Sequence, residues 1–562
     1  MFFDIPGVNG VTIHACRLGD VSRRSPVVLE WTNYILDDPN SYPAAGCPPQ
    51  LKGLAAELVH RGYVYVAAQT RGVGASTGTA QTWSVQDGKD GAAVVEWIAR
   101  QRWSTGHVGL AGCSSSAQEG LQVLVQSPPH LGAAALACFA PDSFRDAIYP
   151  GGMRSYSVLP VASRPLIDLD PVALRTRLDR GDGAALLTES AGRLAADAAF
   201  EAGIVSTDTD GAFWADRSTT LRLNERRAPV LAFGSWADFF LRGTTEWERT
   251  RRPADRLVLL PGWHGAPVEA SGRYGMTARA AAYFDQHLRD LPDSYHGDQA
   301  VVWWEQPGGQ VLDAVGAPDP SRFRQSTDWP PRETGYQVLA LKAPDTTGLL
   351  ARPSLAPEAT TDPRGLGTGS RFTLQQEAQG AVATWTFPAT TKPLHLAGPV
   401  ALRLRVSPLT PELDIYARLV AIAPDNTFRD ITNGWLRGSQ AALDPRRTER
   451  DPRTGTIIRP FHRHDATTPL AVGTPIDLDV ELWQTAAELP TGTRLRLVVT
   501  AEDTPWTLPS GTVELGQVLA GGHLVLPVMA ESTGRVRRRA RPAPARTEGG
   551  GCVCHAGLGV RE

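Results

Sequence analysis

The chain lacks a long apolar run: no stretch approaches the about 18 residues that would span a bilayer. Its amino terminus has no positively charged start followed by an apolar segment, so we expect no secretory signal. The formal net charge is only -3 for 562 residues, which supplies no basic field for nucleic acid. The composition therefore predicts neither a membrane partner nor a nucleic-acid partner.

Cysteine is scarce, and the six cysteines are dispersed: Cys16, Cys47, Cys113, Cys138, Cys552 and Cys554. This dispersion is not typical of a disulfide framework, so the simplest interpretation is a protein of the reducing cytoplasm. Cys552, Cys554 and His555 form a C-x-C-H sequence, but three ligands without a second cluster are a weak zinc signal. We therefore expect no metal and no cofactor.

The length predicts roughly three or four domains, because 562 residues are too many for one core. Apolar strands alternate with helical runs in residues 1–138 and 226–298, as an α/β domain with a parallel sheet requires. Residues 139–225 lack strong strands and are predicted to form a helical cap. Residues 299–530 hold short alternating segments typical of a β-sandwich or jelly roll. The tail, 531–562, is rich in Arg, Pro, Ala and Gly, so we expect disorder.

The alternating segments of the second half begin with VVWWEQPG, at residues 301–308. Taken alone, this half is also compatible with a carbohydrate-binding module, which is its main non-enzymatic alternative. No exposed aromatic platform can be identified in the sequence to support a sugar site.

The most informative stretch is VGLAGCSSSAQEG, residues 108–120, in which an apolar strand runs into a turn of small residues. Gly112, Ser114 and Ser116 match the small-x-Ser-x-small spacing of a nucleophile elbow, where the chain reverses from strand to helix and exposes a serine hydroxyl. An ordinary strand-to-helix turn explains this stretch equally well when it is taken alone. The rest of the chain has to separate the two interpretations.

A serine becomes a strong nucleophile when a histidine takes its proton and a carboxylate orients that histidine. In α/β-hydrolases these residues follow in the order serine, acid, histidine. Here Asp238 follows the buried strand APVLAFGS, and His264 follows the apolar strand RLVLL. Each alone would be interpreted as structural, Asp238 as a loop cap and His264 as a packed histidine. Both lie past the carboxyl ends of strands, where active sites of open α/β sheets form, so together with Ser114 they predict a triad.

The register of the turn leaves alternatives, because small residues flank Ser115 as well as Ser114. We favour Ser114, since it alone keeps Gly112 two residues before the nucleophile. Cys113 is a third candidate nucleophile, but its position in an elbow points inward, which favours a buried apolar role.

Several colinear stretches resemble the CocE/NonD hydrolases, a family related to cocaine esterase and X-Pro dipeptidyl peptidases. They are RGYVYVAAQTRGVGASTG at 61–78, VVEWIARQRWSTGHVG at 94–109 and PDSFRDAIYPGG at 141–152, with GSWADFF and PGWHG around the acid and the histidine. The resemblance extends nearly to residue 530. It implies an α/β-hydrolase domain with a helical cap and a C-terminal jelly roll, and it assigns Ser114, Asp238 and His264 as nucleophile, orienting acid and general base.

The resemblance also implies an oxyanion hole. Its donors would be the phenol of Tyr34, at the end of the strand VVLEWTNY, and the backbone N–H of Ser115. Removing one such donor typically costs about a hundredfold or more in turnover. The alternative for Tyr34 is a packed aromatic. The chain departs from the family at Ser115, which replaces a usual tyrosine, and at Ala117, which replaces a usual glycine, so we expect a different substrate choice.

Aromatic residues of the predicted cap are candidates for the wall of the substrate site. They are Phe144, Tyr149 and Trp214, together with Trp236 of the acid loop. A cap at this place would cover Ser114, exclude water and shape the acyl pocket. The alternative for each aromatic is a place in the core, and the alternative for the insertion is an exposed helical segment without substrate contact.

The sequence thus predicts a serine hydrolase that cleaves a small-molecule ester or acyl amide through a covalent acyl-enzyme. The triad does not separate ester from amide, because both pass through the same tetrahedral intermediate. Two rivals stay open: an acyltransferase with an alcohol or amine acceptor, and a catalytically silent binding protein. The sequence leaves the oligomeric state open, a homo-oligomer included.

Overall fold

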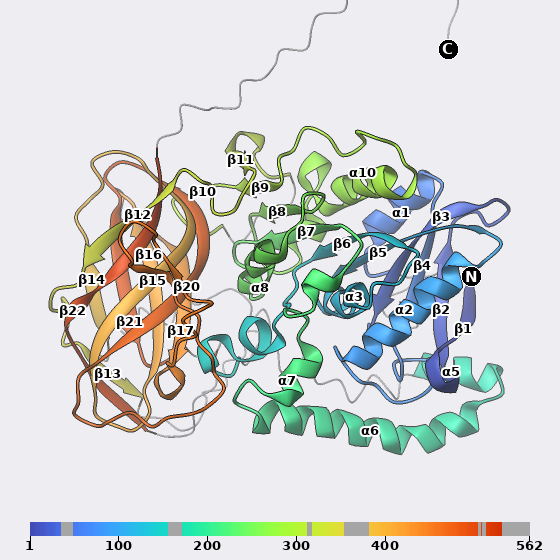
Figure 1. Ribbon diagram of the computed structural model, residues 1–562, viewed down its shortest axis with the longest axis horizontal. Helices are drawn as coiled ribbons and strands as arrows, with labels where there is room; N and C mark the ends of the chain where they lie inside the picture. Colours follow the sequence, from blue (N-terminus) through green and yellow to red (C-terminus); the bar gives the residue numbers. More distant parts are fainter. Residues whose placement is uncertain are drawn as a thin grey trace, which may run out of the picture. The chain divides into compact units, whose positions relative to one another are not determined.

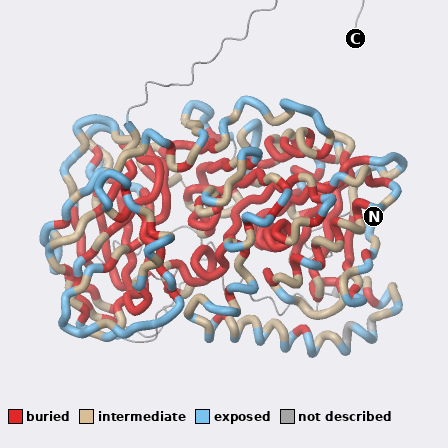
Figure 2. The backbone as a smooth tube through the Cα atoms, in the orientation of Figure 1, coloured by how far each residue is buried: buried red, intermediate tan, exposed pale blue. Residues whose placement is uncertain are grey.

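Two ten-stranded β-sheets organise the part of the chain that the structure describes (Figure 1). The computed structural model describes residues 1–34, 49–155, 171–311, 317–352, 382–503, 507 and 513–530. Buried residues concentrate in the strands of both sheets and in the helix that follows Ser114, whereas the long helix of the insertion is mostly exposed or half-buried (Figure 2). The tail predicted to be disordered, 531–562, lies outside the described residues.

The first sheet is mostly parallel, with antiparallel strands at both edges. In spatial order its strands are β1 (Phe2–Pro6), β2 (Thr12–Leu18), β4 (Val64–Gln69), β3 (Ser25–Thr32), β5 (Ser104–Cys113), β6 (Leu131–Ala137), β7 (Val230–Ser235), β8 (Arg256–Leu260), β9 (Val301–Trp304) and β11 (Phe323–Ser326). Strands β3, β4 and β7 are buried along their whole length. Parallel strands of this kind need helices on both faces of the sheet.

Four helices supply that cover: α2 (Val85–Ala99) and α3 (Ser115–Val125) pack on one face, and α1 (Lys52–His60) and α10 (Met276–Leu288) pack on the other. Two short helices, α8 (Leu241–Glu246) and α9 (Ala266–Glu269), follow β7 and β8. Ser84 is the N-cap of α2: its hydroxyl accepts hydrogen bonds from the N–H groups of Gln86 and Asp87. Each face of the sheet thus has its own apolar core.

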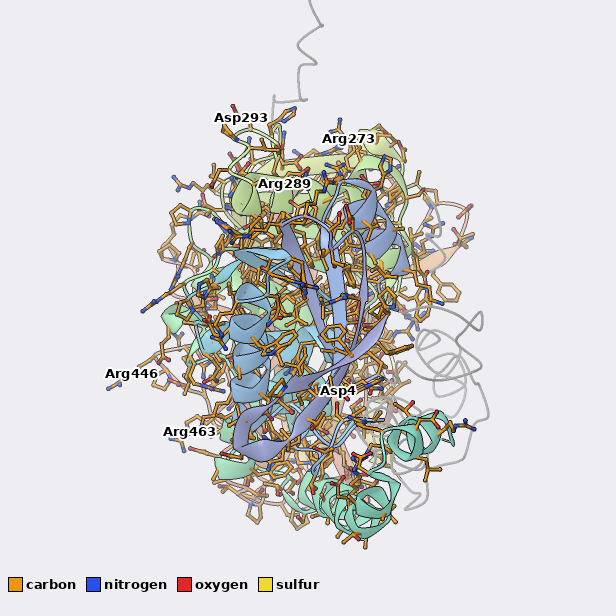
Figure 3. All side chains as sticks on the ribbon, turned by 90° about the vertical axis from the view of Figure 1, so that its right-hand side faces the viewer. Asp4, Arg273, Arg289, Asp293, Arg446 and Arg463 are labelled. Atoms are coloured by element: carbon orange, nitrogen blue, oxygen red, sulfur yellow. The ribbon has the colours of Figure 1, made fainter. Side chains whose placement is uncertain are left out.

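The insertion between β6 and β7 is helical where it is described. It contains a π-helical turn (Ser143–Ile148), α5 (Pro171–Asp179), α6 (Gly183–Ser206) and α7 (Ala212–Arg217). Arg193 of α6 donates to the carbonyls of Gly74, Ser76 and Gly78, in the loop after β4. Asp4 of β1, labelled in Figure 3, pairs with Arg180 directly after α5. These bonds anchor the insertion to the end of the sheet where β4 finishes.

The second sheet is antiparallel apart from the short pairing of β10 with β20. Its strands are β10 (Gln306–Pro307), β12 (Thr334–Ala340), β13 (Leu349–Arg352), β14 (Ala383–Thr386), β15 (Leu394–Pro408), β16 (Asp414–Ile422), β17 (Phe428–Arg437), β20 (Ile476–Leu489), β21 (Arg494–Thr500) and β22 (Glu514–Met529). A small hairpin, β18 (Glu449–Arg450) with β19 (Ile457–Arg459), forms a separate two-stranded sheet that packs against β15 and β22. The sheet surrounds an apolar core of its own.

The first sheet continues beyond the predicted limit at residue 298. Strand β9, which the alternating pattern grouped with the second half, pairs in parallel with β8, and β11 pairs with β9. The physical reason lies in the residues of β9: the run Val301–Trp304 is fully buried, as an internal strand of a parallel sheet requires. A four-residue apolar run carries no information about which sheet it joins.

Among the described residues, Cys16 is the one cysteine that is paired. This residue of β2 is fully buried and disulfide-bonded, whereas Cys113 and Cys138 are free. Distance along the chain does not decide which cysteines meet in the fold, and disulfides persist in oxidising compartments. A cytoplasmic location stays a prediction. Among the described residues, no helix has the length and apolar character needed to cross a membrane.

A buried ionic network links the parts of the chain that carry the two sheets. Arg242 of α8 contacts the carboxylate of Asp146 in the π-helical turn, and its Nε donates to Glu481 of β20 at 2.9 Å. Arg459 of β19 donates to the same Glu481 carboxylate at 3.3 Å. A buried charge is costly unless it is paired. The network therefore stabilises the contact between the two sheet-bearing parts of the chain when all its charges are paired, and removal of one partner leaves a destabilising buried charge.

We expect Arg242→Met to lower the free energy of unfolding by about 3 kcal/mol, because Asp146 is then a buried charge without its cation. Urea denaturation followed by tryptophan fluorescence measures the change. Arg332→Met is the control: the Arg332 side chain is 79% exposed in its pair with Asp328, so its loss should stay below about 1 kcal/mol. Equal losses in the two variants would contradict a stabilising role for the network.

Candidate active site

Ser114 occupies a sharp turn between β5 and α3. Strand β5 ends at Cys113 and α3 begins at Ser115, so one residue carries the reversal. The Ser114 backbone has φ 59° and ψ -126°, a conformation that costs a non-glycine residue on the order of 1–3 kcal/mol. Its N–H donates to the carbonyl of Ala137 on β6, and its carbonyl accepts from the N–H of Gln118, both at 3.0 Å. The turn is thus fixed from the sheet side and from the helix side.

The packing of this turn explains its small residues and favours Ser114 over its neighbours. A Cβ atom on Gly112 would lie 2.6 Å from the carbonyl oxygen of Ser116, closer than side chains tolerate. Ser115 is helical, and its hydroxyl accepts a hydrogen bond from the indole of Trp83 at 2.9 Å. Cys113 is buried. Of the three candidate nucleophiles, Ser114 is the one bonded to a histidine.

Ser114, His264 and Asp238 form a continuous hydrogen-bonded chain. His264 Nε2 lies 2.7 Å from Ser114 Oγ, and His264 Nδ1 lies 2.9 Å from Asp238 Oδ1. Asp238 comes from the loop after β7 and His264 from the loop after β8. The three side chains therefore meet at the carboxyl ends of neighbouring parallel strands, where the sequence places them.

The carboxylate of Asp238 is buried, at 2% exposure, and its Oδ1 also accepts the N–H of Phe240 at 2.8 Å.

Cys138 lies beside Asp238. The Cys138 sulfur, an Asp238 carboxylate oxygen and a His264 ring nitrogen are within 4.8 Å of one another. Burial raises the pKa of the Cys138 thiol well above its ordinary value, as do Cys113 and Asp238, so the thiol stays protonated. Both ring nitrogens of His264 are already hydrogen-bonded, which disfavours a metal at these residues. Cys552, Cys554 and His555 lie outside the described residues.

Of the two predicted oxyanion donors, the N–H of Ser115 lies next to the turn, and the backbone of Tyr34 is linked to the same helix. Ser115 is the first residue of α3, and the N–H groups of a first helical turn have no intrahelical acceptor. Tyr34 follows β3, and its N–H donates to Thr32 Oγ1 at 3.0 Å. That hydroxyl in turn bonds the hydroxyl of Ser116 at 2.8 Å. Tyr34 is thereby tied through one intermediate residue to α3.

Aromatic side chains surround the histidine. Phe239 stacks on the His264 ring with centroids 4.1 Å apart, and Phe240 meets it edge-on at 5.5 Å. Neither contact is predicted from the sequence, although the aromatic pair directly follows the acid. The predicted wall residues Phe144, Tyr149 and Trp214 pack on one another and share a buried cluster with Phe240. They are therefore connected to the histidine through Phe240.

Trp236 lies apart from this aromatic cluster. Its indole N–H donates to the carbonyl of Trp304 on β9 at 2.7 Å, and its ring packs against Trp329. The side chain is buried in the main core of the first sheet. These contacts support a packing role for Trp236 rather than contact with a substrate.

Two protein-family models match the chain. Residues 19–266 match the X-Pro dipeptidyl-peptidase (S15 family), and residues 296–521 match the X-Pro dipeptidyl-peptidase C-terminal non-catalytic domain. Cocaine esterase from Rhodococcus sp. (strain MB1 Bresler) is 26% identical over 437 residues, which cover 68% of this chain and 74% of the relative. The chain is a serine hydrolase that is similar to the CocE/NonD family.

Solved structures share the fold of this serine hydrolase. A CocE/NonD family hydrolase from Staphylococcus aureus superposes with a TM-score of 0.70 at 17% identity, covering 94% of this chain and 93% of the other. An aminopeptidase from a marine sediment Thaumarchaeota archaeon superposes with a TM-score of 0.73 at 15% identity, covering 94% and 96%. The predicted α/β-hydrolase fold with a C-terminal β domain is confirmed, whereas a jelly-roll connectivity of that domain stays a prediction.

The strained turn predicts an unusual order of stability among Ser114 variants. Ser114→Gly should be more stable than Ser114→Ala by about 1 kcal/mol, because glycine adopts a positive φ without penalty. Thermal unfolding measures the difference. The matched pair at Ser116, within α3, should show alanine more stable than glycine by about 0.5–1 kcal/mol. A Ser114→Gly variant that is less stable than Ser114→Ala would show that the turn is not strained.

Proposed function

We propose that this chain hydrolyses a small-molecule ester or acyl amide through a covalent acyl-enzyme on Ser114. The observation that carries the proposal is the pair of hydrogen bonds, 2.7 and 2.9 Å long, that connects Ser114 through His264 to Asp238. This arrangement makes a serine hydroxyl nucleophilic, because the proton has a base to move to and the base has a carboxylate that fixes its tautomer.

In the acylation step, Ser114 Oγ attacks the carbonyl carbon of the substrate while His264 Nε2 accepts the hydroxyl proton. Negative charge then develops on the carbonyl oxygen. The N–H of Ser115 and the phenol of Tyr34 are the donors proposed to stabilise it. Asp238 supports the imidazolium through the bond to Nδ1.

The intermediate collapses when His264 returns the proton to the leaving alcohol or amine. A water molecule then attacks the acyl-enzyme by the same route in reverse, with His264 as its base, and the acid is released. All steps need a histidine ring that stays in place. The ring stacking of Phe239 and the edge contact of Phe240 restrict the imidazole and shield it from bulk water.

The helical insertion is proposed as the cap of the site. Phe144, Tyr149 and Trp214 form a rigid aromatic group behind Phe240, and we assign them to the wall that shapes the acyl side of the substrate. Apolar and aromatic walls with few polar groups are the usual lining of small-molecule sites. The related proteins named above include an esterase and an aminopeptidase, which supports both ester and amide substrates.

Fluorophosphonate treatment tests the nucleophile. We expect one adduct per chain at Ser114, seen by intact mass and peptide mapping, because only an activated serine reacts with this probe. Ser114→Ala should abolish the adduct. Ser115→Ala should still reach one adduct per chain, since it keeps the backbone N–H. An adduct at Ser115 would correct the register, and a folded wild-type protein that takes no label would favour the silent binding protein.

Product analysis separates hydrolysis from acyl transfer. With p-nitrophenyl acetate and added millimolar alcohols or amines, acetate should account for the p-nitrophenol released, because water is the proposed acceptor. Chromatography of the acyl products measures the split. Acetylated acceptor in excess of acetate would instead establish an acyltransferase that uses the same triad.

A further inference from the structure

Trp83 is a buried residue with a strained backbone next to the proposed nucleophile. It precedes the N-cap of α2, its side chain is 2% exposed, and its φ is 58°. A bulky residue with positive φ is a genuine outlier. Such strain persists only where the surroundings determine it, and it gathers at functional sites.

Three hydrogen bonds connect Trp83 to successive turns of α3. Its indole N–H donates to Ser115 Oγ at 2.9 Å, and its backbone N–H donates to Glu119 Oε1 at 3.4 Å. Its carbonyl accepts from Gln122 Nε2 at 2.5 Å. Residues spaced by four and three lie on one face of a helix. Trp83 thus holds the first two turns of the helix that begins directly after Ser114.

Glu119, which accepts the backbone N–H of Trp83, is buried beside a second carboxyl group. Its carboxyl interacts with that of Asp87 in α2, and both side chains are buried. The raised pKa values of the two carboxyl groups disfavour two negative charges in the core. Burial, followed by the neighbouring carboxylate, raises the pKa of Glu119 well above its ordinary value. The pKa of Asp87 rises to about 7, again mainly through burial. Gly88 permits this approach of α2 to α3, since a Cβ there would lie 2.3 Å from the Gln122 carbonyl oxygen.

The other side of Trp83 faces the helical insertion. Phe200 of α6 meets the Trp83 ring edge-on, with centroids 6.4 Å apart. Ile204 of α6 and Trp214 of α7 belong to the same buried cluster. One side chain therefore contacts both the insertion and the start of α3.

We propose that Trp83 is a positioning residue for the oxyanion donor: through its indole N–H it holds Ser115, and thereby fixes the direction of the Ser115 backbone N–H. This inference rests on the proposed function. A serine at the first position of a helix has a short, mobile hydroxyl that can turn toward the free N–H groups of the helix or toward a developing oxyanion. The bond to Trp83 fixes the Ser115 hydroxyl in one orientation. Because Phe200 packs against the Trp83 ring, the position of Trp83, and with it this bond, depends on how the helical insertion packs.

A double-mutant cycle with p-nitrophenyl acetate tests this role. Trp83→Phe keeps an aromatic ring and deletes the donor, and Ser115→Ala deletes the acceptor but keeps the backbone N–H. Each should lower kcat about tenfold with KM changed less than twofold. The reason is that the oxyanion develops in the transition state, so a misplaced N–H weakens transition-state stabilisation more than substrate binding. The double variant should lose no more than either single variant. Fluorophosphonate should label Ser114 fully in all three, but about tenfold more slowly.

Trp247→Phe is the matched control. Trp247 is equally buried, and its indole N–H has no hydrogen-bond partner among the described residues, so kcat should stay within twofold of the wild type. Losses that add in the double variant, or an unchanged kcat in Ser115→Ala, would overturn the proposal. If Trp83→Phe does not fold, Ser115→Ala alone decides, since it removes a single oxygen atom. A wild type that neither labels nor hydrolyses would instead refute the proposed function.

Discussion

The backbone turn at Ser114 is the constraint on which the rest of the site depends. Its positive φ ends β5 and starts α3 within one residue, which exposes the serine hydroxyl and leaves the next N–H without an intrahelical acceptor. The carbonyl of Ala137 on β6 and the close approach of Gly112 to Ser116 keep the turn in this conformation. The nucleophile and one oxyanion donor thus arise from a single feature of the backbone.

The parallel sheet brings the other two groups to the same end. Because β5, β6, β7 and β8 are consecutive parallel neighbours, the loops that follow them meet, and His264 and Asp238 need no long connection to reach Ser114. Around this centre the surroundings are apolar and rigid: Phe239 and Phe240 touch the histidine, and Trp83 holds the start of α3. Arg242 bonds both Glu481 of the β domain and Asp146 of the π-helical turn, and this same turn contains Phe144.

Local motifs and chain order were sufficient to predict Ser114, Asp238 and His264, since strand ends and small-residue turns leave a clear pattern in the sequence. The helical insertion and the alternating strands of the second half were predicted from periodicity. Trp83 was not predicted, because its contacts with α3 come from tertiary packing and the sequence around it has no motif. Trp236 shows the reverse case: it stands two residues before the acid, yet its side chain packs against β9. The sequence of β9 is a short apolar run that fits either sheet. Its place in the first sheet is set by its pairing with β8, which the sequence alone does not reveal.

The most direct test of the account is chemical quench of the reaction with p-nitrophenyl acetate, followed by mass analysis of the peptide that contains Ser114. We expect an acetyl group on Ser114 that forms with the first turnover, decays as acetate appears, and is absent in Ser114→Ala. An acetyl group on Ser115 or Cys113, or acetate production without any acylated peptide under conditions where deacylation is slowed, would contradict it.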